Sequence, residues 1–124
     1  MKKILIVDDQ LEVRELVAVT LMGDKYRILQ AETGQEAIDT TITEKPDLII
    51  MDIMMPGDID GLEATRRIKS NPETKDCKVI ILTAKGQEAD KEKGRKTGAD
   101  DYFVKPFSPL ELIKKIEKIF DVDI

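Results

Sequence analysis

The sequence predicts an α/β fold in which five strands form one parallel sheet and helices cover both of its faces. Four short runs, residues 4–7, 48–51, 79–82 and 102–104, are apolar or aromatic throughout. Strands that are buried on both faces of a parallel sheet have this continuous pattern. Between these runs, apolar residues recur at helical spacing, and strands that alternate with helices pair in parallel through right-handed crossovers.

Five strand–helix units follow one another along the chain. The remaining strand is expected at residues 27–31, after a first helix that Gly23 ends. Four helices have an apolar side, formed by Val13, Leu16, Val17 and Leu21 in the first, Ala37 and Ile38 in the second, Leu62, Ala64, Thr65 and Ile68 in the third, and Leu112, Ile113, Ile116, Ile119 and Phe120 in the fifth. With 124 residues, the chain has the size of a single domain, residues 1–124.

Three helix starts carry a sequence signature. Thr33 and Glu36 fit a capping box, in which each side chain bonds the backbone N–H of the other residue. Asp60 offers an acidic cap for the third helix. Ser108 is expected to cap the fifth helix, with Pro109 at its first position.

The fourth helix, at about residues 87–96, lacks such support. Ala89 is its only apolar side chain, and Gly94 lies inside it at a cost of roughly 1 kcal/mol relative to alanine. We expect this helix to be among the least stable parts of the fold, from which switching elements are drawn. The alternative is a solvated surface helix without such a role.

The predicted topology brings five polar side chains to one rim of the sheet. A doubly wound, flavodoxin-like (βα)5 sheet has the strand order 2-1-3-4-5 and binds ligands at the carboxyl ends of its strands, where strands one and three lie side by side. Asp8 and Asp9 follow the first strand, and Asp52 follows the third. Thr83 and Lys105 follow the fourth and fifth strands, so all five are expected near one crevice.

Three carboxylates in one crevice predict a site for a hard dication. Their repulsion raises their pKa values unless a cation relieves it, and Mg²⁺ is commonly held by one or two carboxylates and phosphate oxygens. Lys105 can pair with a phosphoryl group, and Thr83 can donate a hydrogen bond to it. The chain has no histidine, so an aspartate is the available nucleophile for phosphoryl transfer. The alternatives are helix capping by the aspartates, a surface role for Lys105 and, for Thr83, the common occurrence of threonine at strand ends.

Composition argues against several classes. The net charge is −5, and residues 1–62 hold 13 of the 25 acidic residues but 6 of the 20 basic ones. Without a basic patch and interleaved aromatics, direct nucleic-acid binding is not expected. No apolar stretch approaches the length of a membrane span, so membrane insertion is not expected either. Cys77 is the only cysteine, which fits a reducing cytoplasm.

Four motifs, taken together and in order, are specific for a known family. They are Val7-Asp8-Asp9, Met51-Asp52-Ile53-Met54-Met55-Pro56-Gly57, Leu82-Thr83-Ala84 and Gly98-Ala99-Asp100-Asp101-Tyr102-Phe103-Val104-Lys105-Pro106-Phe107. From end to end the chain resembles a bacterial response-regulator receiver domain of two-component signalling, of the single-domain chemotaxis and sporulation type.

The resemblance implies a role for each acidic residue. Asp52 would be the phosphoacceptor, which takes a phosphoryl group from a phosphohistidine on a sensor histidine kinase or phosphotransfer protein. Asp9, Asp52 and the backbone carbonyl of Met54 would bind Mg²⁺ directly, and Asp8 would act through a metal-bound water. Such a phosphoacceptor phosphorylates and dephosphorylates itself and is not an enzyme in the usual sense.

The resemblance also implies switch residues. Thr83 would move its hydroxyl to the phosphoryl group, Lys105 would be the ion-pair partner of that group, and Tyr102 would turn inward on activation. The peptide bond between Lys105 and Pro106 would be cis. One departure is visible, because the loop from Met-Pro to Asp-Gly, residues 55–61, has one residue more than is usual in the family.

We expect a stand-alone receiver that contacts a downstream effector protein through its fourth helix, fifth strand and fifth helix. The basic residues of that face, which favour an acidic partner, are Lys91, Lys93, Lys96, Lys114 and Lys118. A phosphorylation-dependent dimer stays open, and so does a receiver from a longer DNA-binding regulator or hybrid kinase. The rivals of another class are a flavodoxin-like cofactor binder, whose phosphate Asp8 and Asp9 would repel, and a metal-dependent phosphatase.

Overall fold

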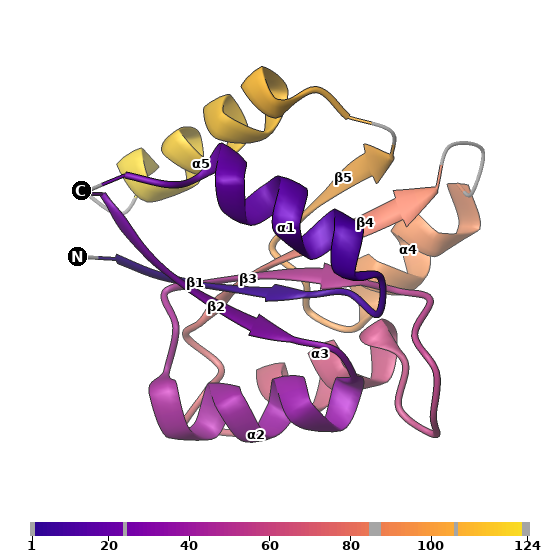
Figure 1. The fold of residues 1–124 in the computed structure, drawn as a ribbon. Coiled ribbons are helices and arrows are strands. Elements are labelled where there is room, and N and C mark those ends of the chain that lie inside the picture. Colours follow the sequence, from indigo (N-terminus) through magenta and orange to yellow (C-terminus); the bar gives the residue numbers. More distant parts are fainter. Residues whose placement is uncertain (1, 24, 85–87, 106, 123–124) are drawn as a thin grey trace.

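The computed structural model describes residues 2–23, 25–84, 88–105 and 107–122, which form a sheet between two layers of helices (Figure 1). The strands are β1 (Lys2–Val7), β2 (Tyr26–Ala31), β3 (Leu48–Asp52), β4 (Lys78–Ala84) and β5 (Asp101–Lys105). The helices are α1 (Leu11–Thr20), α2 (Gly34–Glu44), α3 (Gly61–Ser70), α4 (Glu88–Lys96) and α5 (Pro109–Val122).

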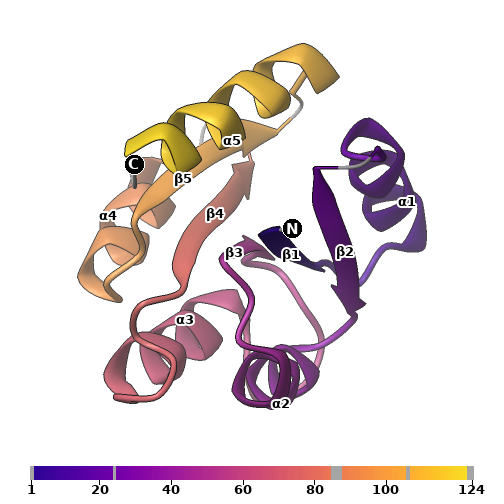
Figure 2. The same ribbon diagram turned by 90° about the vertical axis from the view of Figure 1, so that its left-hand side faces the viewer.

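The sheet has the predicted topology. Its order is β2-β1-β3-β4-β5, and every neighbouring pair is parallel. The helices α1 and α5 cover one face of the sheet, and α2, α3 and α4 lie on the other side (Figure 2). All strands therefore end at the same rim, where α1, α3 and α5 begin.

Two apolar clusters fill the space between the layers, because successive residues of a strand point to opposite faces. The cluster beneath α2 and α3 includes the strand residues Leu5, Val7, Ile49, Met51, Val79 and Ile81. The cluster beneath α1 and α5 includes Ile4, Ile6, Leu48, Ile50, Ile80 and Leu82. Burial on both sides explains why these strands read as unbroken apolar runs, and it holds the ends of β1 and β3 rigidly in place.

Three helix starts follow the predicted caps. The side chain of Thr33 accepts a hydrogen bond from the backbone N–H of Glu36 at 3.1 Å, and Asp60 accepts one from the N–H of residue 63 at 2.8 Å. Ser108 accepts one from the N–H of residue 111 at 3.1 Å. The start of α1 differs, since the side chain of its N-cap residue Gln10 accepts no capping hydrogen bond.

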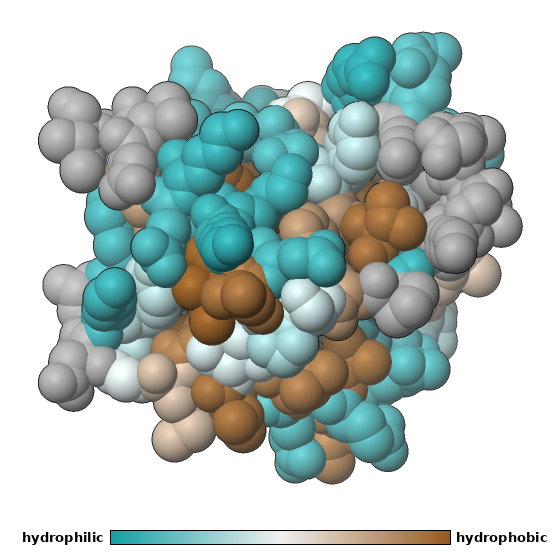
Figure 3. Space-filling model, turned by 90° about the horizontal axis from the view of Figure 1, so that it is seen from above, coloured by the Kyte–Doolittle hydropathy of each residue, from teal (hydrophilic) through white to brown (hydrophobic). Residues whose placement is uncertain are grey.

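The apolar side of α1 is narrower than predicted. Val17 and Leu21 are buried, but Leu16 is 50% exposed, and Val19 is also exposed. Helical spacing alone placed Leu16 on the packed side of α1. In the structure, α1 packs on the rest of the protein only along a narrow stripe that includes Val17 and Leu21. Figure 3 looks down on the α1–α5 side and shows apolar surface gathered there among hydrophilic residues.

Helix α4 lies close to the sheet because of Gly94, which is buried. A Cβ at this position would lie 2.9 Å from Cδ1 of Ile81 in β4. Beside this contact is a cavity of about 110 Å³, which Ile81, Gly94, Ala99 and Tyr102 help to line. The glycine that weakens the isolated helix thus permits its close approach. Low stability of α4 stays a prediction, and Gln87 lies outside the described residues.

The loop between β3 and α3 rests on the start of α2. A Cβ at Gly34 would lie 2.7 Å from Cγ2 of Ile59 and would also overlap the carbonyl oxygen of that residue. The longer loop is therefore seated against α2 at a position that only glycine allows. Within the described part of the chain, no helix is long and apolar enough to cross a membrane.

Candidate functional site

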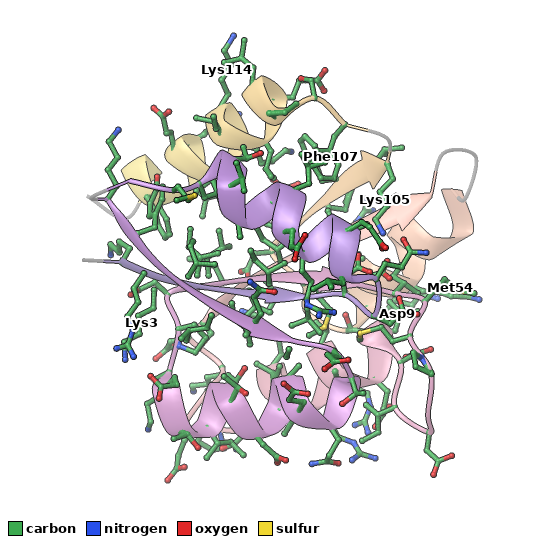
Figure 4. All side chains as sticks on the ribbon, in the orientation of Figure 1. Lys3, Asp9, Met54, Lys105, Phe107 and Lys114 are labelled. Carbon is green, nitrogen blue, oxygen red and sulfur yellow. The ribbon has the colours of Figure 1, made fainter. Side chains whose placement is uncertain are left out.

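The polar rim predicted from the sequence lies at the carboxyl ends of β1, β3, β4 and β5. Asp8 and Asp9 directly follow β1, and Asp52 is the last residue of β3. Thr83 and Lys105 lie within the last two residues of β4 and β5 rather than after them, because the ladder continues through the pair Ala84–Lys105. Figure 4 shows Asp9, Met54 and Lys105 at this rim, while Lys3 lies at the opposite end of the sheet.

Three carboxylates meet at this rim. The ligand oxygens of Asp8, Asp9 and Asp52 all lie within 4.8 Å of one another, and no other such acidic group of three or more occurs in the described part of the chain. Asp8 is fully buried and Asp52 is 7% exposed, whereas Asp9 faces solvent. The acidic cluster is thus half buried, and Asp9 is its exposed member.

Lys105 joins two of these carboxylates. Its Nζ donates to Oδ2 of Asp8 and to Oδ1 of Asp52, both at 3.1 Å. Burial raises the pKa of Asp52. The ammonium of Lys105 lowers this pKa and the carboxylates of Asp8 and Asp9 raise it, so that the pKa of Asp52 lies above its ordinary value. Burial lowers the pKa of Lys105, but the two carboxylates outweigh burial and leave that pKa above its ordinary value. The ammonium is therefore firmly charged and only partly neutralises the cluster.

Thr83 brings an unsatisfied hydroxyl to the end of β4. Its side chain is buried, and its Oγ1 is the only buried side-chain polar atom of the described residues without a hydrogen-bond partner. Leu82, the residue before it, pairs with Asp52 across the ladder. A buried polar group without a partner costs about 1–3 kcal/mol, so the folded chain holds this hydroxyl in a state that a new acceptor would relieve.

Helix capping does not explain the positions of these aspartates. The N-cap residue of α1 is Gln10 and that of α3 is Asp60. Asp8 does accept a hydrogen bond from the backbone N–H of Gln10 at 2.9 Å, through Oδ1, but Asp9 and Asp52 cap no helix. Helix capping, the alternative role considered for these aspartates, is therefore excluded for Asp9 and Asp52.

Residues 4–117 match the family described as response regulator receiver domain. The chain belongs to this family. This receiver is 47% identical, over 118 residues, to the phosphate regulon transcriptional regulatory protein PhoB of Pseudomonas aeruginosa, a match that covers 95% of this chain and 51% of PhoB. The chain spans about half the length of such curated relatives.

Solved receivers share its fold. The chemotaxis response regulator CheY4 of Vibrio cholerae superposes with a TM-score of 0.88 at 31% identity, covering 96% of this chain and 98% of CheY4. The receiver domain of the sensor histidine kinase PA1611 from Pseudomonas aeruginosa has a TM-score of 0.85 at 29% identity, with 94% and 95% covered, and is described with a magnesium ion in its active site cleft. Receivers are phosphoacceptors of two-component signal transduction rather than classical enzymes. The family match therefore favours this class of protein over a flavodoxin-like cofactor binder.

The other predicted residues of the receiver lie around the cluster or outside it. Met54 is 77% exposed in the loop after β3 and lies at the same rim of the sheet as Asp9 (Figure 4). Tyr102 is partly buried, packs against the apolar cluster beneath α2 and α3, and pairs with Ile81 in the ladder. Pro106 lies outside the described residues, and with it the predicted cis peptide.

Two residues that support the site escaped the sequence reasoning. Arg14 of α1 is buried and donates to the backbone carbonyl of Asp8 at 2.7 Å. Gly61, the first residue of α3, lies so close to Asp52 that a Cβ would overlap the carbonyl oxygen of the aspartate. The only indication of Arg14 in the sequence is its place directly after Val13, as a charged residue beside the apolar stripe of α1.

Proposed function

We propose that this receiver accepts a phosphoryl group on Asp52 in the presence of Mg²⁺ and transmits the signal as a conformational switch. The observation that carries the proposal is the half-buried cluster in which Asp52 meets two further carboxylates and the ammonium of Lys105. Phosphoryl transfer needs alignment and charge neutralisation more than covalent help from the protein.

Asp52 is the nucleophile in this proposal. A carboxylate oxygen attacks the phosphorus of a phosphohistidine in line, the P–N bond breaks, and the electron pair of that bond returns to the histidine nitrogen. Water later attacks the acyl phosphate, which releases inorganic phosphate and regenerates the carboxylate. The position of Asp52 at the end of a fully buried strand supports this role, because β3 and Gly61 hold its backbone on both sides.

The residues present fit a magnesium ion. Asp9, Asp52 and the carbonyl of Met54 would hold it directly, and Asp8 through a water; three carboxylates whose oxygens lie within 4.8 Å of one another suit a hard dication. The raised pKa of Asp52 supports the same assignment, since Lys105 alone does not neutralise the cluster. When bound, the ion supplies charge neutralisation for the transferred group.

Thr83 and Lys105 form the proposed switch. Phosphorylation adds about −1.5 to −2 charges and new acceptor oxygens at Asp52. The buried hydroxyl of Thr83 can donate to this group, and Lys105 can pair with it, so the phosphorylated state favours one conformation. Shifting a two-state equilibrium from 1:99 to 99:1 takes about 5.5 kcal/mol, which a few charge-assisted hydrogen bonds at a half-buried site can supply. Tyr102, next to the cavity beneath α4, would follow the movement of Thr83.

Two surfaces fit the partners that we propose. A phosphohistidine of a sensor histidine kinase or phosphotransfer protein must reach the rim, where the exposed apolar side chains Leu11, Met54 and Leu110 stand on segments that begin there. A downstream effector protein would bind the α4–β5–α5 face, on which Lys93, Lys96, Lys114 and Lys118 are exposed; the side chain of Lys91 lies outside the described part of the chain. We place this exchange in the cytoplasm, where a single buried Cys77 stays reduced.

Intact mass measurement tests the proposal. After incubation with acetyl phosphate, the wild type should gain one phosphoryl mass with Mg²⁺ and none when Mg²⁺ is chelated. Asp52→Asn should show no gain, while Asp58→Asn, which changes an exposed aspartate of the neighbouring loop, should behave as wild type. No gain in the wild type would contradict phosphoacceptor function, and a gain that persists in Asp52→Asn would mean that another residue is the nucleophile.

A further inference from the structure

Arg14 carries the only buried positive charge among the described residues. The side chain is 7% exposed, and the other buried charged residues are Asp8 and Asp52. Its Nη1 donates to the backbone carbonyl of Asp8 at 2.7 Å, and its Nε donates to Oε1 of Gln30 at 3.1 Å. A buried charge is tolerated only when hydrogen bonds satisfy it, and here a residue of β2 and the turn after β1 share that task.

The bond to Asp8 fixes the peptide plane that leads into Asp9. The carbonyl of Asp8 and the N–H of Asp9 belong to one planar unit, so a hydrogen bond to the carbonyl also sets the direction in which Asp9 leaves the strand. The rest of Asp8 is held by a bond from its N–H to the carbonyl of Ala31 at 3.2 Å and by the bond from Lys105. Asp9 itself is exposed, so its carboxylate relies on the backbone for its position.

Gln30 completes the arrangement from the neighbouring strand. It is the last residue but one of β2, and its amide oxygen accepts the Nε–H of Arg14, which orients the planar guanidinium. Arginine suits this place because its fork can serve two acceptors at once, whereas the lysine ammonium is a point charge on a flexible stem. The contacts thus link β2, α1 and the end of β1.

We propose that Arg14 is a positioning residue that, oriented by Gln30, holds the Asp8–Asp9 peptide so that the Asp9 carboxylate faces Asp52 for cation binding. The identity of the cation as Mg²⁺ rests on the proposed function. Groups that hold metal ligands from behind contribute substantially to affinity, and their loss weakens metal binding by about 10–100-fold.

Charge and geometry predict opposite effects at this position. A positive charge near the acidic cluster repels a second cation, so its removal alone would tighten Mg²⁺ binding. Loss of positioning weakens binding instead. The variant Arg14→Lys keeps the charge and loses the fork, and Gln30→Ala keeps Arg14 and removes only its orienting partner. Because Gln30 is exposed, this second change does not open a cavity in the core.

Isothermal titration with MgCl₂, without a phosphodonor, provides the test. Arg14→Lys should bind Mg²⁺ about tenfold more weakly than wild type, and Gln30→Ala should also bind more weakly. Arg27→Lys, a matched change on the exposed side of β2, should leave affinity unchanged. With acetyl phosphate, half-saturation by Mg²⁺ should rise in Arg14→Lys while the rate at saturating Mg²⁺ stays close to wild type, a separation that general destabilisation would not produce.

Several results would overturn the inference. Wild-type affinity in folded Arg14→Lys, or tighter binding in Arg14→Ala, would show that no positioning takes place. If Arg14→Lys fails to fold, Gln30→Ala decides, and unchanged affinity there sinks the idea. A wild type that binds Mg²⁺ but never takes up a phosphoryl group would refute the proposed function and leave the role of Arg14 standing. A wild type that binds no Mg²⁺ would remove both.

Discussion

Replacing Thr83 with valine should stabilise the unphosphorylated protein. The hydroxyl is buried and has no hydrogen-bond partner, so no hydrogen bond offsets its desolvation cost of about 1–3 kcal/mol in the folded state. Valine keeps nearly the same shape and removes that cost. Allowing for imperfect packing of the new methyl group, we expect a gain of about 1 kcal/mol, which corresponds to a rise in Tm of about 4 °C for a domain of this size.

Equilibrium urea unfolding of metal-free protein measures this gain, and Thr65→Val serves as the matched control. Thr65 is as deeply buried, but its hydroxyl donates to the carbonyl of Gly61 at 2.7 Å, so the same substitution there removes a bond and should destabilise by about 1 kcal/mol. Equal destabilisation by both substitutions would refute the reasoning, because it would mean that the hydroxyl of Thr83 is satisfied in the resting protein.

The same variant separates stability from signalling. Thr83→Val keeps Asp52 and should still take up a phosphoryl group from acetyl phosphate. It should lose the change in amide hydrogen exchange that we expect phosphorylation to cause in α4 and β5 of the wild type. A stabilised variant that retains this change would show that the switch does not run through Thr83.

The further predictions concern the pH dependence of stability, two glycines and the stability of α4. Burial and the acidic neighbours raise the pKa of Asp52 in the folded state, so ionisation of Asp52 lowers folding stability as the pH rises above the ordinary pKa of 3.8. Metal-free Asp52→Asn should therefore be more stable than the wild type at pH 7. Urea titrations should show that this difference in stability vanishes as the pH falls toward 3.8. Gly94→Ala should stabilise by about 0.5 kcal/mol, because the helix gains propensity and Cδ1 of Ile81 can move into the adjacent cavity. Gly61→Ala should instead cost about 3 kcal/mol or more in the same assay, since its Cβ would meet the backbone of Asp52; equal effects of the two would contradict this account. Hydrogen exchange should show weaker protection in residues 88–96 than in 109–120, and equal protection would refute a weakly held α4.

Much of the site could be predicted because strands buried on both faces leave a plain sequence pattern. The apolar runs placed Asp8, Asp9 and Asp52 at strand ends, and the parallel order brought those ends together. Arg14 could not be found in this way, because its importance lies in a bond to a backbone carbonyl, and carbonyls leave no trace in a sequence.

The error at Leu16 and the close packing at Gly94, which the sequence did not reveal, have a related origin. Helical spacing shows which residues share a side of a helix, but it does not show how wide a stripe the neighbouring layer covers, and α1 leaves Leu16 exposed. Propensity counted Gly94 as a loss. The structure offsets part of that loss, because the glycine leaves room for Ile81 where a side chain would have been.

The bond between Lys105 and Asp8 joins residues that are 97 positions apart. During synthesis, the three aspartates emerge well before Lys105, whose ammonium partly neutralises the cluster, and their repulsion opposes closure of the rim until β5 has paired with β4. Contacts of such long range form late and slow the folding of a chain. The ability to take up a phosphoryl group should therefore appear only when the sheet is complete, so that incompletely synthesised chains cannot take part in signalling.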